Sequence, residues 1–205
     1  MRGIQKAQTP AVNGMQTVRG LFRHAMAVLL LIFLQGCAEK NFIELRSGIE
    51  TRGHYINGVP FREQKKFDCG PAALSGVFAF WGKPADMDRV TAGIYLPQLK
   101  GTLPMDMERF ARESGLETDS SAGTLDRLKG FIRRGVPIIC LIDTGFGPYR
   151  QPHYITAIGF DDVNAVVVMH DGSQENRLMS YDAFDRAWAR AGRWMIGIEP
   201  VRERK

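Results

Sequence analysis

Short apolar segments, separated by only a few residues, constrain the second half of this chain most strongly. Residues 136–143 form a continuous apolar run of strand length, and residues 154–160 and 165–169 resemble it. The last two are joined by Asp161-Asp162-Val163-Asn164, a connection short enough for a hairpin. Consecutive strands with short connections pair antiparallel. We therefore expect an antiparallel sheet, to which residues 194–199 add a strand.

Helices are predicted mainly before these strands. Residues 70–81 carry small and apolar side chains spaced for a buried helix, with Pro71 in its first turn. Further helices are predicted at residues 87–95, 103–113, 125–134 and 181–191. Segregation of helices and strands predicts an α+β fold, with N-terminal helices packed on an antiparallel β-sheet. A chain of 205 residues has room for one such domain.

The charge of the chain does not indicate a nucleic-acid partner. The formal net charge is +5, from 27 basic and 22 acidic residues. Four basic residues and no acidic residue precede residue 37, so 23 basic and 22 acidic residues remain in the rest of the chain. A nearly neutral body cannot follow a phosphate backbone, so we predict no nucleic-acid binding.

The first 36 residues are predicted to be a signal peptide. The apolar run at residues 25–34 follows Arg19 and Arg23. At about half of the roughly 20 residues that a membrane span requires, it is too short to be a permanent transmembrane helix. An ordinary secretory signal and a buried helix are the alternatives.

The end of this run resembles the bacterial lipobox, through Leu34-Gln35-Gly36-Cys37. The resemblance implies that Cys37 carries a lipid and begins the mature protein. It divides the chain into a lipoprotein signal peptide (1–36), a lipidated tether (37–57) and a folded domain (58–205). The protein would then be a membrane lipoprotein of the bacterial cell envelope that faces the periplasm or the exterior. Ala38 would permit the outer membrane.

Cys69 is the candidate nucleophile because it lies at the start of the helix predicted over residues 70–81. The helix dipole and free backbone N–H groups at this end favour the reactive thiolate. We expect the Asp68 side chain to cap the helix. Two alternatives are a disulfide with Cys140 and a metal site; no Cys or His spacing supports the metal site. Cys140 lies in the apolar run, where a thiol is typically buried and inert.

His153 and Asp171 are the candidate partners of Cys69. His153 begins the strand predicted at residues 154–160, and Asp171 closes the next strand. Pairing of these strands as a hairpin brings the two residues together. His170 is the rival base, but adjacent side chains in a strand point to opposite faces. The segment 144–150 before His153 is either a loop over the cleft or a plain connection.

Three segments in order resemble the C39-type cysteine peptidases and their stand-alone relatives: VPFREQKKFDCGPAAL, QPHYITAIGF and VVVMHDG. The resemblance implies a papain-like fold, with Cys69 as nucleophile, His153 as general base and Asp171 orienting the imidazole. Gln64 matches the glutamine whose side-chain N–H contributes to the oxyanion hole. No transporter or ATPase accompanies the domain here, so the double-glycine specificity of the bacteriocin-processing enzymes is not carried over.

These features together predict a lipid-anchored cysteine peptidase that hydrolyses a peptide or protein substrate without a cofactor. Two alternatives remain. One is another thiol acyl-transfer enzyme such as a cell-wall amidase, although Asp-Cys-Ser-Gly would be expected there in place of Asp-Cys-Gly-Pro. The other is a catalytically silent peptide-binding module. The oligomeric state is open.

Overall fold

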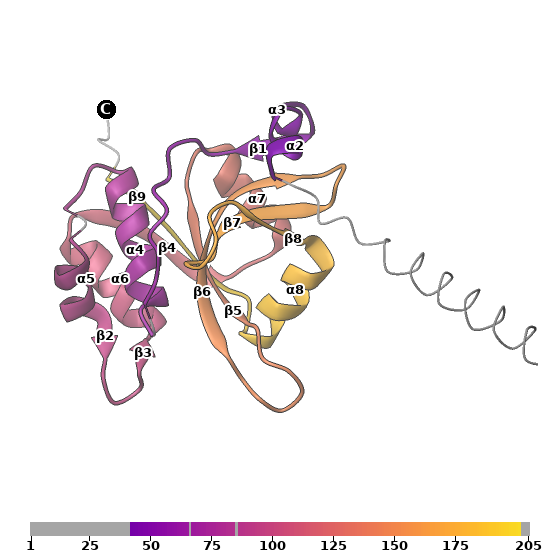
Figure 1. The fold of residues 1–205 in the computed structure, drawn as a ribbon. Coiled ribbons are helices and arrows are strands. Elements are labelled where there is room, and N and C mark those ends of the chain that lie inside the picture. The colour runs from indigo at the N-terminus through magenta and orange to yellow at the C-terminus, as the bar shows by residue number, and fades with distance from the viewer. Residues whose placement is uncertain (1–41, 66, 85, 202–205) are drawn as a thin grey trace, which may run out of the picture. The chain divides into compact units, whose positions relative to one another are not determined.

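A seven-stranded antiparallel sheet forms the centre of the computed structural model, within the described residues 42–65, 67–84 and 86–201 (Figure 1). The strand order is β4-β9-β5-β6-β7-β8, and β1 pairs with β6. The strands are β1 (Gly53–Tyr55), β4 (Leu116–Ala122), β5 (Ile138–Asp143), β6 (Pro152–Asp161), β7 (Val166–His170), β8 (Arg177–Ser180) and β9 (Trp194–Pro200). The predicted hairpin of β6 and β7 is confirmed, since the two strands pair antiparallel.

Helices cover both faces of this sheet (Figure 1). One layer consists of α4 (Cys69–Phe80), α5 (Met87–Ile94) and α6 (Pro104–Glu113), and the opposite face carries α7 (Leu125–Arg133) and α8 (Tyr181–Arg190). A small hairpin of β2 (Tyr95–Leu96) and β3 (Gly101–Thr102) joins α5 to α6. The predicted α+β class, with N-terminal helices on an antiparallel sheet, is confirmed, and the structure adds the second helical layer.

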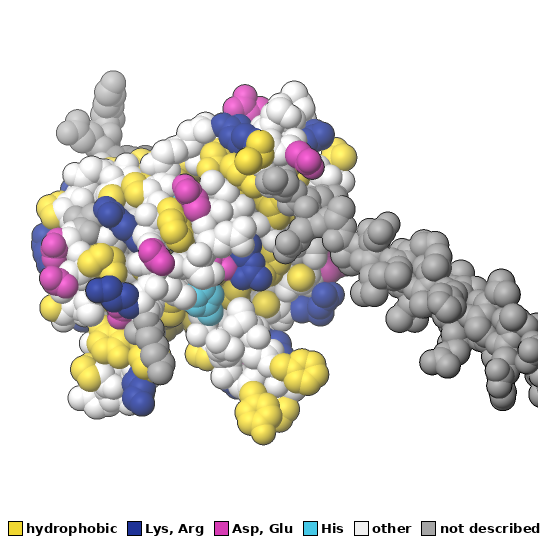
Figure 2. Space-filling view, in the orientation of Figure 1, with side chains coloured by type: hydrophobic (Ala, Val, Ile, Leu, Met, Phe, Trp, Pro, Cys, Tyr) yellow, Lys and Arg dark blue, Asp and Glu magenta, His cyan; other side chains and the backbone are white. Residues whose placement is uncertain are grey.

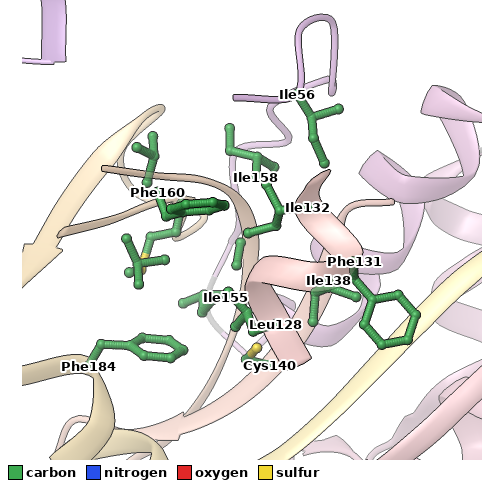
Figure 3. Packing of buried hydrophobic residues seen from close by; sticks show 14 of the residues in the cluster. Ile56, Leu128, Phe131, Ile132, Ile138, Cys140, Ile155, Ile158, Phe160 and Phe184 are labelled. Carbon is green, nitrogen blue, oxygen red and sulfur yellow. The ribbon is translucent and has the colours of Figure 1, made fainter. Parts of the chain in front are cut away.

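Two hydrophobic cores result, one on each face, and β5 contributes to both by strict alternation. Ile138, Cys140 and Ile142 pack into the core beneath α7 and α8, whereas Ile139 packs beneath α4 and α6. Figure 3 shows the first core, where α7 presents Phe131 and neighbouring side chains to the sheet. A strand buried on both faces reads as a continuous apolar run, which is the pattern that identified it in the sequence.

A β-bulge in β6 changes which side chains face the first core. The register with β7 shifts between Ala157 and Gly159, and side chains on both sides of the shift, Ile155 and Ile158, reach the same core. A bulge adds one residue to one strand and so reverses the alternation beyond it. His153 precedes the bulge, so the face of the sheet on which its side chain lies is set by the pairing of β6 with β5.

The tether predicted at residues 37–57 is wrong for residues 42–57, which belong to the folded domain. Here α2 (Phe42–Arg46) and α3 (Ile49–Arg52) precede β1. Leu45 and Ile49 are buried in the first core, and Tyr55 pairs with Gly159 of β6. The apolar side chains of this segment follow no single sequence period, because they belong to two short helices and a strand in succession.

The predicted signal peptide and Cys37 lie outside the described residues. Among the residues that are described, no helix is long and apolar enough to cross a bilayer.

Candidate active site

Cys69 is the first residue of α4, as the sequence predicts. Phe67, two residues earlier, has a φ of 73°, a left-handed conformation that is uncommon for a residue with a side chain. Asp68 precedes the helix, but its side chain makes no capping hydrogen bond to the described residues of α4, so the predicted cap is wrong. The Asp68 carboxylate therefore does not occupy the helix N-terminus at which the thiol lies.

Cys69 and His153 interact directly. Burial of the thiol raises its pKa, but hydrogen bonds from the His153 ring and from the Tyr154 N–H, with the charge of His153, outweigh burial and hold the pKa of Cys69 below its ordinary value. Burial lowers the pKa of His153, but the contacts with Cys69 and with Asp171 together outweigh burial and raise it. The two shifts favour a thiolate beside an imidazolium, the reactive state of a cysteine nucleophile.

His153 also contacts Asp171, but not through the carboxylate that the sequence analysis assigns to this role. The ring Nε2 lies 2.8 Å from the main-chain oxygen of Asp171. Because that carbonyl can only accept, Nε2 donates and Nδ1 remains for Cys69. The prediction that His153 and Asp171 lie side by side is thus confirmed. The prediction that the Asp171 carboxylate contacts the imidazole is wrong, because the main-chain oxygen makes the contact.

The Asp171 carboxylate instead holds the turn that follows β7. One oxygen accepts from the Ser173 N–H at 2.9 Å, the Ser173 hydroxyl at 2.8 Å and the Gln174 N–H at 2.7 Å. The other pairs with Arg177 at 2.6 Å. Burial raises the pKa of Asp171, but these contacts outweigh burial and lower it. The carboxylate thereby fixes the backbone whose carbonyl meets His153.

Replacing Asp171 with asparagine is expected to lower kcat by no more than about tenfold, since only the ion pair with Arg177 is lost. The amide oxygen can still accept from Ser173 and Gln174. Steady-state kinetics on a peptide substrate would test this, with Arg177→Met as the matched variant that removes the same ion pair. A far larger loss for Asp171→Asn, with Arg177→Met silent, would mean that the carboxylate itself orients His153.

Gln64 lies against Gly172, the residue after Asp171. The main-chain N–H of Gln64 donates to the main-chain carbonyl of Gly172 at 2.9 Å. A Cβ at position 172 would lie 2.5 Å from the Gln64 Oε1, and Gly172 has a φ of 77°. The Gln64 amide oxygen is buried and has no hydrogen-bond partner among the residues that the structure describes. Because an added Cβ would clash with it, glycine at position 172 makes room for the Gln64 side chain in the same cleft as Cys69.

Because the family resemblance assigns the Gln64 side chain to the oxyanion hole, replacing Gly172 with alanine is expected to displace Gln64 and lower kcat/KM about 10²-fold, the effect of losing one oxyanion donor. Gly58→Ala is the matched control: its φ is 76°, and no atom of the described part of the chain lies within 4 Å of the added methyl group. Both variants carry about 1 kcal/mol of backbone strain, which thermal unfolding would show. Equal activity losses in the two variants, or additive losses when Gly172→Ala is combined with Gln64→Ala, would refute the positioning role of Gly172.

His170 makes its hydrogen bonds away from Cys69, and Cys140 is buried in the core, as the sequence predicts. His170 Nε2 lies 3.0 Å from the Val59 carbonyl, and its Nδ1 accepts from the Asn176 N–H at 3.3 Å. Both ring nitrogens are therefore engaged away from Cys69. Cys140 is fully buried and burial raises the pKa of its thiol. Both cysteines of the described residues are free, which leaves the predicted alternative of a disulfide without support.

Cys69, His153 and Gln64 open into a cleft of about 810 Å³. One wall is the β2–β3 hairpin with the residues after it, and the other is the end of the β5–β6 loop. The hairpin is tied to the site, since the Tyr154 hydroxyl donates to the Thr102 carbonyl at 3.0 Å. Tyr154 and the hairpin were not among the predicted site residues, because β2 and β3 have two residues each and show no sequence pattern. The lining also includes Phe67, Leu99, Lys100, Gly101, Leu103, Pro104, Leu141, Arg150, Gln151 and Pro152.

No group of three His, Cys, Asp or Glu side chains could hold a metal ion among the residues that the structure describes.

The sheet flanked by helices, with a cysteine at a helix N-terminus facing a histidine on the central strand, defines the papain-like cysteine peptidase class. A family model, "Peptidase_C39 like family", matches residues 56–196. The chain therefore belongs to the C39-like peptidases and is a cysteine peptidase.

Solved structures agree on the fold. The peptidase domain of Streptococcus ComA, a bifunctional ABC transporter, has a TM-score of 0.59 at 21% identity, covering 70% of this chain and 100% of that one. A double-glycine-motif protease from an AMS/PCAT transporter, in complex with the leader peptide, has a TM-score of 0.59 at 21% identity, covering 74% and 96%. Xylellain, a cysteine protease from Xylella fastidiosa, has a TM-score of 0.51 at 11% identity, covering 77% and 90%. The search of curated proteins found no match.

Proposed function

We propose that this cysteine peptidase hydrolyses peptide bonds of a peptide or protein through Cys69, His153 and Gln64, with Asp171 holding the imidazole by its main-chain oxygen. The observation that carries the proposal is the position of the His153 ring, which interacts with Cys69 and has its Nε2 2.8 Å from the Asp171 carbonyl. This contact selects the ring orientation and tautomer that a general acid–base residue needs.

The chemistry follows from these positions. The Cys69 thiolate attacks the carbonyl carbon of the scissile bond, and the Gln64 amide N–H stabilises the negative charge on the carbonyl oxygen. The protonated His153 then gives its proton to the leaving amine, and the C–N bond breaks to leave a thioester on Cys69. A water molecule, deprotonated by His153, hydrolyses the thioester and releases the carboxylic acid and the free thiol.

A polypeptide substrate is supported by the structure of the relative from the AMS/PCAT transporter, which holds a leader peptide. The test is to incubate the protein with a peptide library and, separately, with purified peptidoglycan. New peptide amino termini that depend on Cys69 would support the proposal. Release of peptidoglycan fragments alone would identify a cell-wall amidase, and binding of peptides without turnover would identify a binding module.

We also propose that the protein is lipid-anchored at Cys37 and faces the periplasm or the exterior, with Ala38 permitting the outer membrane. The support is the lipobox motif after an apolar run with a positive flank. Cells grown with labelled palmitate are expected to label the wild-type protein and the Cys140→Ala control, but not Cys37→Ser. Label on the Cys37→Ser variant, or none on the wild type, would contradict the anchor.

A further inference from the structure

The loop between β5 and β6, residues 144–151, carries two strongly exposed aromatic side chains. Phe146 is 89% exposed and Tyr149 is 79% exposed. The loop projects below the body of the domain in Figure 1, and Figure 2, in the same orientation, shows hydrophobic side chains at the tip of that projection. We call residues 144–151 the aromatic loop. Exposed rings gathered on one short segment are typical of a binding surface.

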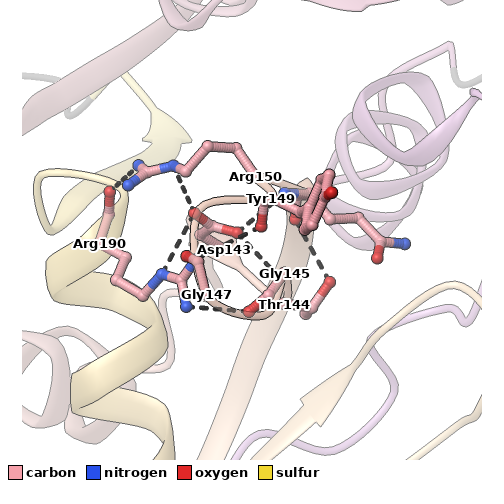
Figure 4. Close-up of polar contacts among 8 residues, drawn as sticks. Asp143, Thr144, Gly145, Gly147, Tyr149, Arg150 and Arg190 are labelled. Carbon is pink, nitrogen blue, oxygen red and sulfur yellow. Dashed lines mark hydrogen bonds and ion pairs between the residues drawn. The ribbon is translucent and has the colours of Figure 1, made fainter.

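A buried carboxylate holds the aromatic loop at its base (Figure 4). The Asp143 side chain is 1% exposed, and its Oδ1 accepts from the N–H groups of Gly145 and Gln151, each at 2.9 Å. Its Oδ2 pairs with Arg150 at 2.6 Å and with Arg190 at 3.4 Å. Both ends of the aromatic loop are therefore hydrogen-bonded to the same carboxylate.

The last residue of α8 holds the middle of the aromatic loop. Arg190 donates to the carbonyls of Gly145 at 2.9 Å, Gly147 at 3.3 Å and Tyr149 at 3.5 Å. The Tyr149 N–H donates to the Phe146 carbonyl at 3.1 Å, which closes the tip. The backbone that carries the rings is thus formed before any partner binds, which reduces the entropy that binding costs.

The aromatic loop is continuous with the catalytic cleft. Residues 150–152 line the cleft together with Cys69 and His153. A polypeptide that leaves the cleft past residues 150–152 passes the base of the aromatic loop. Apart from the Cys69 and His153 pair, the charged side chains among the described lining residues are Arg150, which pairs with Asp143 at the base of the loop, and Lys100, which lies on the β2–β3 hairpin across the cleft. The loop therefore offers apolar contacts through Phe146 and Tyr149, and the cation of Lys100 across the cleft is complementary to an acidic side chain of the same polypeptide.

We propose that the aromatic loop is an exosite, which binds an apolar and acidic segment of a polypeptide substrate several residues away from the bond that is cut. The inference rests on the proposed peptidase function and adds the substrate class to it. The substrate is a polypeptide long enough to reach from Cys69 to Phe146 and Tyr149, and not a free dipeptide or tripeptide.

The test measures binding separately from chemistry. The full chain with Cys69→Ala is immobilised and used to capture peptides from a randomised dodecapeptide library, which mass spectrometry then identifies. Affinity for the best captured sequence is measured by fluorescence anisotropy, with and without the added pair Phe146→Ala and Tyr149→Ala. We expect the captured peptides to be rich in apolar and acidic residues, and the pair to weaken binding about tenfold or more.

Val163→Ala is the matched control, since Val163 is 72% exposed and lies in the turn between β6 and β7. It is expected to leave the affinity unchanged. Equal affinity with and without the Phe146 and Tyr149 substitutions would overturn the exosite. So would unchanged peptide affinity accompanied by weaker cosedimentation with phosphatidylglycerol vesicles, which would identify a membrane contact.

The two proposals fail differently in this experiment. Hydrolysis by the unsubstituted chain, without any dependence of peptide binding on the aromatic loop, would refute the exosite alone. Peptide capture that depends on the loop, without hydrolysis by the unsubstituted chain, would refute the peptidase mechanism and leave the exosite in place.

Discussion

Replacing Cys69 with alanine is expected to lower kcat/KM for peptide hydrolysis by about 10⁴-fold or more, because the only proposed covalent intermediate forms on its sulfur. The fold is expected to survive, since Cys69 is half-buried at the start of α4 and alanine is a good helix former. The measurement is the rate of peptide-library cleavage, with circular dichroism to establish folding.

Cys140→Ala is the matched control for this prediction. Cys140 is fully buried in the core beneath α7 and α8, and its sulfur plays no part in the proposed chemistry. This variant is expected to lose some stability and to keep its catalytic activity. A Cys69→Ala variant that cleaves at the wild-type rate, or a Cys140→Ala variant that is folded but inactive, would contradict the assignment of the nucleophile.

Replacing His153 with alanine is expected to lower kcat about 10³-fold, within the range of general acid–base catalysis. It should also raise the pKa of Cys69, because the hydrogen bond and the charge of His153 are two of the contributions that together outweigh burial of the thiol. Iodoacetamide reacts with the thiolate alone. The alkylation rate of Cys69 at neutral pH is therefore expected to fall in the variant, and its midpoint to move to higher pH.

The same shifts set the pH dependence of hydrolysis. Activity is lost as the pH falls through the lowered pKa of Cys69, because the thiolate takes up a proton. It is also lost as the pH rises through the raised pKa of His153, because the proton for the leaving amine is no longer available. His54→Ala, which removes an imidazole from β1, is the control. It should change neither the acidic nor the alkaline loss of activity in the pH profile. Alkylation of Cys69 that does not respond to His153→Ala would disprove the ion pair.

The elements with a strong local pattern agree closely with their predictions. The helix predicted at residues 70–81 is α4, and the run at 136–143 contains β5. Both are largely buried, so each stands out in the sequence as a run of apolar and small residues of helix or strand length. By contrast, β4 consists of LETDSSA, and only Leu116 in it is buried. An edge strand with polar side chains has no pattern that separates it from a loop.

The candidate site was predictable as a set of positions. Cys69 begins a helix, and the hairpin of β6 and β7 brings His153 beside Asp171. Both statements depend on the order and the connections of neighbouring elements, which the chain encodes locally. Gln64 depended on the resemblance to a family, since no local pattern distinguishes a glutamine of an oxyanion hole from an exposed one.

Atomic contacts within the site were decided only when distant segments packed together. The carbonyl of Asp171 meets His153 because Ser173, Gln174 and Arg177 occupy its carboxylate. The aromatic loop is held by Arg190, which lies far along the chain at the end of another helix. Sequence periods report which face of an element is buried. They do not report which atom of a polar side chain finds a partner, because that choice depends on the competing donors and acceptors that the fold brings within hydrogen-bond distance.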